Sequence, residues 1–188
     1  MIEVFIMKII YETERLIVRE WEDDDYRDLF EYASDERVAK YLFQPYKDLE
    51  TAKKRIAKLK AQYQEDSFKR DYPIMLKSEN KVIGSISMSD YKPQAGGIIM
   101  IGYTLNHNYQ GNGYATEAVI GLFKHIKKNK IAKRIFALHD VENEKSGNVM
   151  KRAGMTFEGI LRKAGENQVH SRYDVAQYSI LDEEIVLN

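Results

Sequence analysis

The chain reads Tyr109-Gln110-Gly111-Asn112-Gly113-Tyr114-Ala115-Thr116-Glu117-Ala118 at the point where its hydrophobic pattern changes period. Before this stretch, residues 98–105 form a nearly unbroken apolar run, typical of a strand buried on both faces of a sheet. After it, apolar residues recur along one helical face, at Ala115, Ala118, Val119, Leu122, Phe123 and Ile126. The stretch is therefore predicted to be a glycine-rich turn between a buried strand and an amphipathic helix.

Such a turn can bind phosphate groups. The first turn of a helix leaves backbone N–H groups without partners and carries partial positive charge. Gly111 and Gly113 lack the Cβ atoms that would hold a ligand away, so a diphosphate could lie on bare backbone. Many sharp turns of this kind bind nothing, however. The P-loop pattern is absent from the chain, and Thr116 replaces the third glycine of the dinucleotide-binding pattern.

The wider pattern resembles the acetyl-CoA signature of the GNAT superfamily of N-acetyltransferases. Residues 110–115 fit the signature Gln/Arg-x-x-Gly-x-Gly/Ala, and the Tyr-Ala-Thr-Glu-Ala of residues 114–118 is similar to the ribosomal-protein alanine N-acetyltransferase branch. Segments that agree with this branch stand at residues 13–19, 34–42, 101–105 and 143–155. The resemblance covers residues 11–182, which is most of the chain.

Composition is compatible with one enzyme domain. The chain has 188 residues, 44% of them hydrophobic, and no linker or low-complexity tract, which predicts a single domain. The resemblance implies that this is an N-acetyltransferase domain over 1–188, with residues 1–10 as an N-terminal extension. The 29 basic and 29 acidic residues argue against a nucleic-acid-binding surface. A cluster of cations at residues 124–134 is interpreted as complementing the end of the helix.

Location and metal content are also constrained. The absence of cysteine excludes disulfides, a thiol nucleophile and cysteine-ligated zinc. No apolar run approaches the roughly 20 residues that a membrane span needs, and the first residues lack a signal-peptide pattern. We expect a cytoplasmic protein with no bound metal and no nucleic-acid or membrane partner. Whether it forms a homodimer is left open.

The resemblance implies an α/β (α+β) fold: a mixed, mostly antiparallel sheet of six to seven strands, flanked by helices on both faces. Strands are expected at residues 14–21, 71–78, 82–91, 97–106, 134–140, 156–163 and 172–182, and helices at 24–36, 48–66, 112–129 and 144–153. In the family's fold the strands at 97–106 and 134–140 splay apart, and the pantetheine arm of acetyl-CoA lies in the opening.

The resemblance also assigns the cofactor site. The expected acetyl-CoA-binding residues are Tyr103, Thr104, Leu105, Gln110, Gly111, Asn112, Gly113, Tyr114, Ala115, Thr116, Asn143, Ser146 and Lys151. Asn143 would bond the pantetheine amides, although an Asx turn would also explain it. Lys151 is equally compatible with a solvated surface position. Glu117 complements the helix dipole and is interpreted as structural.

Three residues are expected to act in catalysis: Ser146, Glu166 and Leu105. The backbone N–H of Leu105, or of Thr104, is the expected donor to the oxyanion. The resemblance assigns Ser146 to the departing sulfur, because Met150 stands where many acetyltransferases have a tyrosine. A helix cap is the alternative reading of Ser146.

An amine must lose a proton before or during attack, and the base is the least clear assignment. Met100 stands where family members often have a glutamate, and Glu166 is displaced by one residue from the glutamate of the ribosomal-protein branch. Further candidates are Asp90, Asp174 and His107. Asp174 could instead form a structural hydrogen bond between strands, and proton loss through water is another route.

The acceptor pocket is expected to draw on residues 22–46 and 163–174. Aromatic side chains and a carboxylate there would suit a cationic amine: Tyr26, Tyr41, Phe43, Tyr46, Glu166 and Tyr173. We therefore expect an acetyl-CoA-dependent N-acetyltransferase that acts on a primary amine, such as a peptide N-terminus, a polyamine or an aminated small molecule. The alternative is an acyl-CoA-binding module that has lost catalysis and serves as a sensor or partner.

Overall fold

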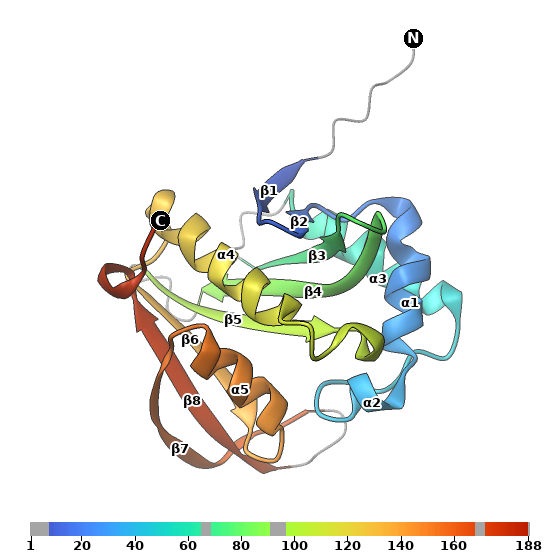
Figure 1. Cartoon of the computed structure of the whole chain (residues 1–188). Helices are drawn as coiled ribbons and strands as arrows, with labels where there is room; N and C mark the ends of the chain where they lie inside the picture. Colours follow the sequence, from blue (N-terminus) through green and yellow to red (C-terminus); the bar gives the residue numbers. More distant parts are fainter. Residues whose placement is uncertain (1–7, 65–68, 91–96, 168–171, 188) are drawn as a thin grey trace.

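The computed structural model describes residues 8–64, 69–90, 97–167 and 172–187, and these form one eight-stranded sheet with helices on both faces (Figure 1). The strand order is β1-β2-β3-β4-β5-β6-β8-β7. The strands are β1 (Ile9–Glu12), β2 (Leu16–Arg19), β3 (Arg70–Leu76), β4 (Lys81–Asp90), β5 (Ile98–Leu105), β6 (Arg134–Asp140), β7 (Thr156–Gly165) and β8 (Tyr173–Leu181). The helices are α1 (Tyr26–Ala33), α2 (Glu36–Ala39), α3 (Leu49–Gln62), α4 (Tyr114–Lys128) and α5 (Glu144–Arg152).

The expected class of fold is confirmed, but the expected six to seven strands are too few. The additional strand is β1, which spans four residues and pairs antiparallel with β2. Its contacts come from elsewhere in the chain, since the Tyr11 hydroxyl donates to the carbonyl oxygen of Ala118 in α4 at 2.7 Å. A segment this short has too little alternation of its own to reveal a strand.

The β5 and β6 strands diverge, as the resemblance implied. They pair in parallel only where residues 98–100 lie opposite residues 134–136. Beyond that point β5 stays paired with β4 up to Leu105, and β6 stays paired with β8 up to Asp140. Each strand keeps one neighbour, and an opening forms between them.

Two apolar clusters pack on opposite faces of the sheet. One lies under α4 and α5 and includes the helical stripe Ala118, Val119, Leu122, Phe123 and Ile126, all of which are buried. The other lies under α1 and α3 and is built around Trp21, Tyr32 and Ile56. Figure 1 shows α4 and α5 together on one side of the strands, with α3 on the other. Burial of each large apolar side chain contributes about 1.5–3 kcal/mol.

Helix ends follow the local sequence. Asp48 begins α3, where its side chain accepts from the Thr51 N–H at 2.8 Å, and Gly154 follows α5 with a φ of +87°. The helix expected at 24–36 is divided, because Asp35 accepts from the Arg37 N–H and so caps a separate helix, α2. No helix in the described part of the chain has the length and apolarity needed to cross a membrane.

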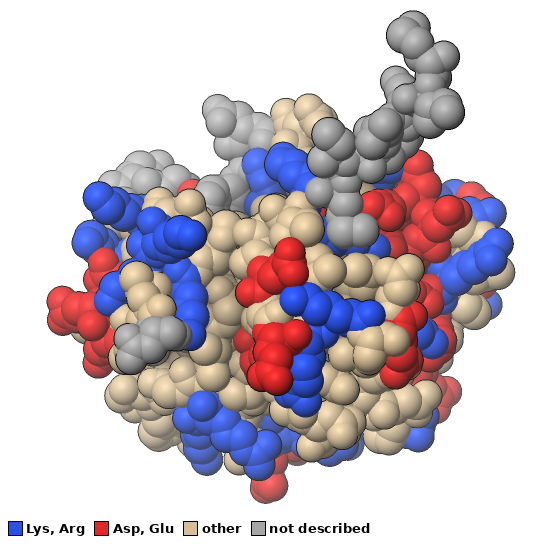
Figure 2. Space-filling model, turned by 45° about the horizontal axis from the view of Figure 1, so that its top comes forward, with Lys and Arg blue, Asp and Glu red and all other residues tan. Residues whose placement is uncertain are grey.

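Basic side chains gather at the end of α4 and interact with the last described segment. The Lys127 ammonium donates to the carbonyl oxygen of Ile185 at 2.6 Å, and Lys133 pairs with Asp182 at 2.8 Å. On the face that Figure 2 shows, Lys and Arg side chains are interspersed with Asp and Glu. These two contacts join the cluster to the segment after β8 rather than to carbonyl groups at the end of α4, so the interpretation of the cluster as a complement to the helix end stays a prediction.

Candidate active site

The glycine-rich turn leaves the beginning of α4 open. Gly111 and Gly113 have φ values of +86° and +82°, in the left-handed region that glycine tolerates best. Gly113 is the N-cap residue of α4 and, having no side chain, caps no backbone N–H. The first-turn N–H groups of α4 are thus available to an anion.

Arg15 lies beside this turn, and Glu117 positions it. The Glu117 carboxylate accepts from the Thr13 hydroxyl and from the Arg15 backbone N–H, and it pairs with the Arg15 guanidinium at 2.6 Å. Although burial raises the pKa of Glu117, these hydrogen bonds lower it overall. Arg15 also donates to the carbonyl oxygen of Asn112 at 3.1 Å and lies over the Tyr114 ring. Glu117 is therefore structural, and it holds a half-exposed cation next to the anion site.

Gln110 connects the turn to two other elements. Its side-chain amide donates to the carbonyl oxygen of Leu105 at 3.3 Å and accepts from the Lys145 ammonium at 3.1 Å. The turn, the end of β5 and the first turn of α5 are thereby joined. Sequence reasoning assigned no role to Lys145 or Arg15, although Arg15 lies in a segment that carried the family resemblance.

The end of β5 directs backbone groups into the opening. The Asn106 N–H donates to the carbonyl oxygen of Ile83 at 2.8 Å, toward β4. Because successive residues of a strand direct their polar groups to opposite edges, the N–H of Leu105 lies on the β6 side. Across the pair, a Cβ on Gly84 would lie 2.2 Å from the carbonyl oxygen of Thr104, so only glycine fits there.

Tyr103 and Ser146 meet across the opening. The Tyr103 hydroxyl donates to the Ser146 carbonyl oxygen at 2.8 Å and lies 3.0 Å from the Ser146 hydroxyl. Burial raises the pKa of Tyr103, so its hydroxyl stays protonated and can donate. Asn143 is the N-cap of α5, with its side-chain oxygen accepting from the Ser146 N–H at 3.4 Å. The alternative reading of Ser146 as the cap is therefore wrong.

The remaining cofactor candidates lie on the same two helices. Tyr114, Ala115 and Thr116 form the first turn of α4, and the Asn112 side chain bonds the carbonyl oxygen of Tyr109 within the turn. Lys151 is exposed in the last turn of α5, away from the end that carries Asn143 and Ser146.

The candidate bases lie in different places. Glu166 is exposed just after β7, beside Asn167, whose side chain donates to the carbonyl oxygen of Tyr41 at 2.9 Å. Asp174 accepts from the Lys163 N–H at 2.9 Å, and this bond, with the nearby Lys163 charge, lowers its pKa. Asp174 thus has the structural role that was its alternative reading. His107 lies in the short 3-10 helix after β5, and Asp90 is exposed at the end of β4.

A pocket of about 440 Å³ lies on the face of the sheet opposite α4. Thr104, at the end of β5, is one of its lining residues. Two of the aromatic residues expected in the acceptor pocket, Phe43 and Tyr46, also line it. Tyr26, Tyr41, Glu166 and Tyr173 are not among its described lining residues.

Asp71 and Arg55 line the same pocket, and the sequence analysis assigned neither residue a role. Burial raises the pKa of Asp71 to about 6, while Arg55 and a hydrogen bond from Trp21 oppose this rise. The available signal was a carboxylate at the start of an otherwise apolar strand, and perturbed carboxylates in pockets are functional candidates.

The comparisons with known proteins identify the family. A model of the acetyltransferase (GNAT) domain matches residues 15–156. The chain is 35% identical over 172 residues to the uncharacterized N-acetyltransferase YnaD of Bacillus subtilis (strain 168), covering 92% of this chain and 96% of YnaD. A GNAT-family acetyltransferase structure from Bacillus anthracis is similar with a TM-score of 0.81 and 30% identity, covering 93% of this chain and 99% of that one.

A second similar structure has a bound ligand. RimL, the ribosomal L7/L12 alpha-N-protein acetyltransferase in complex with coenzyme A, shares the fold with a TM-score of 0.80 at 22% identity, covering 93% of this chain and 99% of RimL. Together with the site geometry, these matches define a class of enzyme. The chain belongs to the GNAT acetyltransferase family and is an acetyl-CoA-dependent N-acetyltransferase. They favour the transferase over a binding module without catalysis.

Proposed function

We propose that this enzyme transfers an acetyl group from acetyl-CoA directly to a primary amine within a ternary complex. The observation that carries the proposal is the position of the end of β5. The Tyr103 hydroxyl reaches Ser146 across the opening, and Gly102, Tyr103 and Thr104 at the end of the same strand all line the pocket. The end of β5 therefore lies between the space for the thioester and the space for the amine.

The residues around the opening fit acetyl-CoA. The uncapped beginning of α4 with Gly111 and Gly113 suits a diphosphate, and Arg15 and Lys145 add positive charge beside it. Asn112, Tyr114, Ala115 and Thr116 surround the same turn, and Asn143 lies at the beginning of α5. Lys151 is retained as a candidate for the CoA moiety at the far end of α5.

When bound, acetyl-CoA supplies the activated acyl group that the amine attacks. We assign the Leu105 N–H as the donor to the carbonyl oxygen, where negative charge develops. The Ser146 hydroxyl is the proposed donor to the departing sulfur, and the Tyr103 hydroxyl orients it from 3.0 Å. These donors are set before reaction by β5 and α5.

Glu166 is the proposed proton acceptor, directly or through water. It is exposed on the loop that Asn167 ties to Tyr41, and Asp174 is a weaker base because its pKa is lowered. Glu166→Gln should reduce kcat about a hundredfold at neutral pH, the lower end of what a general base contributes. An unchanged kcat would assign proton removal to water alone.

The acceptor classes that suit this site are a peptide N-terminus, a polyamine and an aminated small molecule. We also propose a cytoplasmic location, without nucleic-acid or membrane partners, which the cysteine-free and charge-balanced sequence supports. A homodimer stays a prediction that sedimentation velocity can test.

The first experiment is thiol detection of free CoA released from acetyl-CoA, with N-terminal peptides, spermidine, aminoglycosides and amino acids as acceptors. The chain contains no cysteine, so it adds no background. Turnover with any amine supports the proposal and names the acceptor class. Absence of turnover across the panel, with acetyl-CoA still raising the melting temperature, would contradict it.

A further inference from the structure

The pocket floor is a row of small and polar side chains that leads away from the end of β5. In the register of the sheet, Asp71 on β3 pairs with Ser87 on β4, and Ser87 pairs with Gly102 on β5. The neighbouring row includes Ser85 and Thr104. Paired residues of antiparallel strands point to the same face, so these side chains share the face that the pocket occupies.

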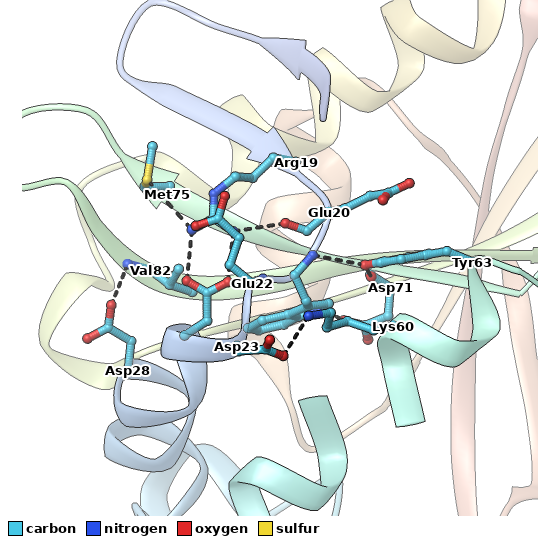
Figure 3. Close-up of polar contacts among 12 residues, drawn as sticks. Arg19, Glu20, Glu22, Asp23, Asp28, Lys60, Tyr63, Asp71, Met75 and Val82 are labelled. Carbon is cyan, nitrogen blue, oxygen red and sulfur yellow. Dashed lines mark hydrogen bonds and ion pairs between the residues drawn. The ribbon is translucent and has the colours of Figure 1, made fainter. Parts of the chain in front are cut away.

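Asp71 closes the inner end of this floor, and its position is held by several contacts. Its carboxylate accepts from the Trp21 indole N–H at 3.1 Å, and the side chain is 19% exposed. The Tyr63 hydroxyl donates to the Asp71 carbonyl oxygen at 2.6 Å and accepts from the Trp21 backbone N–H at 3.2 Å (Figure 3). Asp71 is therefore a nearly buried carboxylate with one well-formed side-chain hydrogen bond and room for a further donor.

Arg55 on α3 lies next to Asp71 without engaging it closely. The nearest guanidinium nitrogen is 3.9 Å from the carboxylate, beyond hydrogen-bond distance. The side chain is 37% exposed and lines the pocket. In the described part of the chain no hydrogen bond from this guanidinium is found, so its donors can reach a pocket ligand.

The two side chains are too far from the reacting atoms to act on them. Neighbouring strands are about 4.8 Å apart, so the backbone of Asp71 on β3 is about 10 Å from that of β5. A base needs contact within roughly 3 Å, or one bridging water. Asp71 and Arg55 can therefore bind only a second group of the acceptor, remote from the amine that reacts.

The charges select the chemistry of that second group. A second cation, as in a polyamine, would be attracted by Asp71 but repelled by Arg55, and a lone anion would meet the opposite conflict. A group that carries both an ammonium and a carboxylate satisfies both side chains. In lysine, five bonds separate the α-carbon from the terminal nitrogen and span about 6 Å when extended. Together with the length of the Asp71 side chain and one hydrogen bond, this matches the separation of about 10 Å between the backbones of β3 and β5.

We propose that Asp71 and Arg55 bind the zwitterionic amino-acid head of a diamino carboxylic acid, whose terminal amine extends to β5 for acetylation. This rests on the proposed function and narrows its acceptor class. The α-ammonium donates to the Asp71 carboxylate, and the Arg55 guanidinium donates to the α-carboxylate. The small side chains of the pocket floor, including Ser85 and Ser87, lie beneath the methylene chain that connects the head to the terminal amine.

The test compares lysine and ornithine with analogues that each lack one charge of the head: cadaverine lacks the carboxylate, and 6-aminohexanoate lacks the α-amine. Lysine or ornithine should have a kcat/KM at least tenfold above either analogue. Asp71→Asn and Arg55→Gln should raise the KM for lysine about tenfold while kcat changes less than twofold. Lys58→Gln, at an exposed position of α3, is the matched control and should leave both constants unchanged.

Calorimetric titration of lysine into the protein with CoA present separates this inference from the proposed function. Tenfold weaker binding of lysine to Arg55→Gln supports the zwitterion subsite even without turnover. Turnover of peptides or spermidine that is insensitive to both substitutions, with no measurable lysine binding, would overturn the subsite and leave the acetyltransferase proposal intact. Equal kinetics for lysine and cadaverine would also overturn it.

Discussion

Two residues carry the most specific assignments in the site: Gly113 in the proposed diphosphate site and Ser146 beside the proposed position of the sulfur. Gly113 has a positive φ at the beginning of α4, next to Arg15 and on the backbone assigned to the diphosphate. Ser146 meets Tyr103 between β5 and α5. Neither residue is buried in the core, so substitutions there act first on the site, and the backbone strain at Gly113 needs a matched control.

Gly113→Glu should abolish the stabilisation of the protein by acetyl-CoA, because the side chain places bulk and negative charge on the anion site. Gly154→Glu is the matched control: its φ of +87° imposes similar backbone strain, and its surroundings are open. At a ligand concentration of 100 times Kd the parent and the control should gain about 2.7 kcal/mol. Thermal unfolding with and without acetyl-CoA measures this. If acetyl-CoA stabilised Gly113→Glu as much as the parent, the assignment of the cofactor site to the beginning of α4 would be wrong.

Ser146→Ala should lower kcat about tenfold and change the Kd of acetyl-CoA less than twofold, because the hydroxyl acts on the departing sulfur rather than on the bound ground state. Tyr103→Phe should show a smaller loss in the same direction. Steady-state kinetics and calorimetry give the two quantities. Turnover equal to the parent's would leave Ser146 with a structural role only.

At the scale of elements, the polar contacts between strands hold the half of the sheet beyond the opening. Glu158 on β7 accepts from Arg134 on β6 and from Gln177 and Ser179 on β8. The hydrogen bond from Arg134, followed by those from Gln177 and Ser179, lowers the pKa of Glu158 to about 2 against the penalty of burial. The three strands β6, β8 and β7 thus share one carboxylate.

Glu158→Gln should make the protein less stable at pH 7 by about 1–2 kcal/mol, a figure reduced for the side chain's partial exposure. Because the folded-state pKa is lowered, this stabilisation is present above the unfolded value near 4.5 and is lost as pH falls toward 2. Urea unfolding between pH 3 and pH 7 measures the difference. Glu183→Gln, on an exposed residue, is the control. A difference between Glu158→Gln and the parent that does not shrink on acidification would contradict the assignment.

At the scale of the whole molecule, the two apolar clusters lie on opposite faces of one continuous sheet. Neither cluster has a separate set of strands. The β5–β6 opening is closed at one end by three residue pairs, and Tyr103 and Ser146 connect its two sides further along. Residues 1–188 are therefore expected to behave as a single domain.

Thermal unfolding should show one cooperative transition, with equal calorimetric and van't Hoff enthalpies. Acetyl-CoA should move the whole transition upward, since its site includes both sides of the opening. Differential scanning calorimetry is the measurement. Two transitions, or a ligand shift confined to one of them, would show that the sheet unfolds in two parts.

The sequence by itself determined the features that arise within one segment. The change of period around residues 109–118 predicted the β5-turn-α4 unit, and the α4 stripe is buried as expected. The spacing of Asn143 and Ser146 placed them at the beginning of one helix. Side chains within a helix or strand repeat with a known period, so such features depend on neighbours that are close in the chain.

Only the tertiary structure decided which distant segments meet. Arg55 comes from α3, Asp71 from β3 and Trp21 from the connection after β2. Strand β1 is likewise held by distant segments, since it pairs with β2 and contacts α4. Sequence reasoning expected the acceptor pocket to draw on residues 22–46 and 163–174. Residues of the first range do line the pocket beside Thr104, and Asp71 on β3 and Arg55 on α3 line it as well, which the sequence did not indicate. Part of the second range, residues 168–171, lies outside the described residues, so its place in the pocket stays a prediction. These contacts are set by the strand register and by the packing of the helices on the sheet. Register and packing in turn depend on the cooperative burial of two apolar cores, to which segments far apart in the chain contribute.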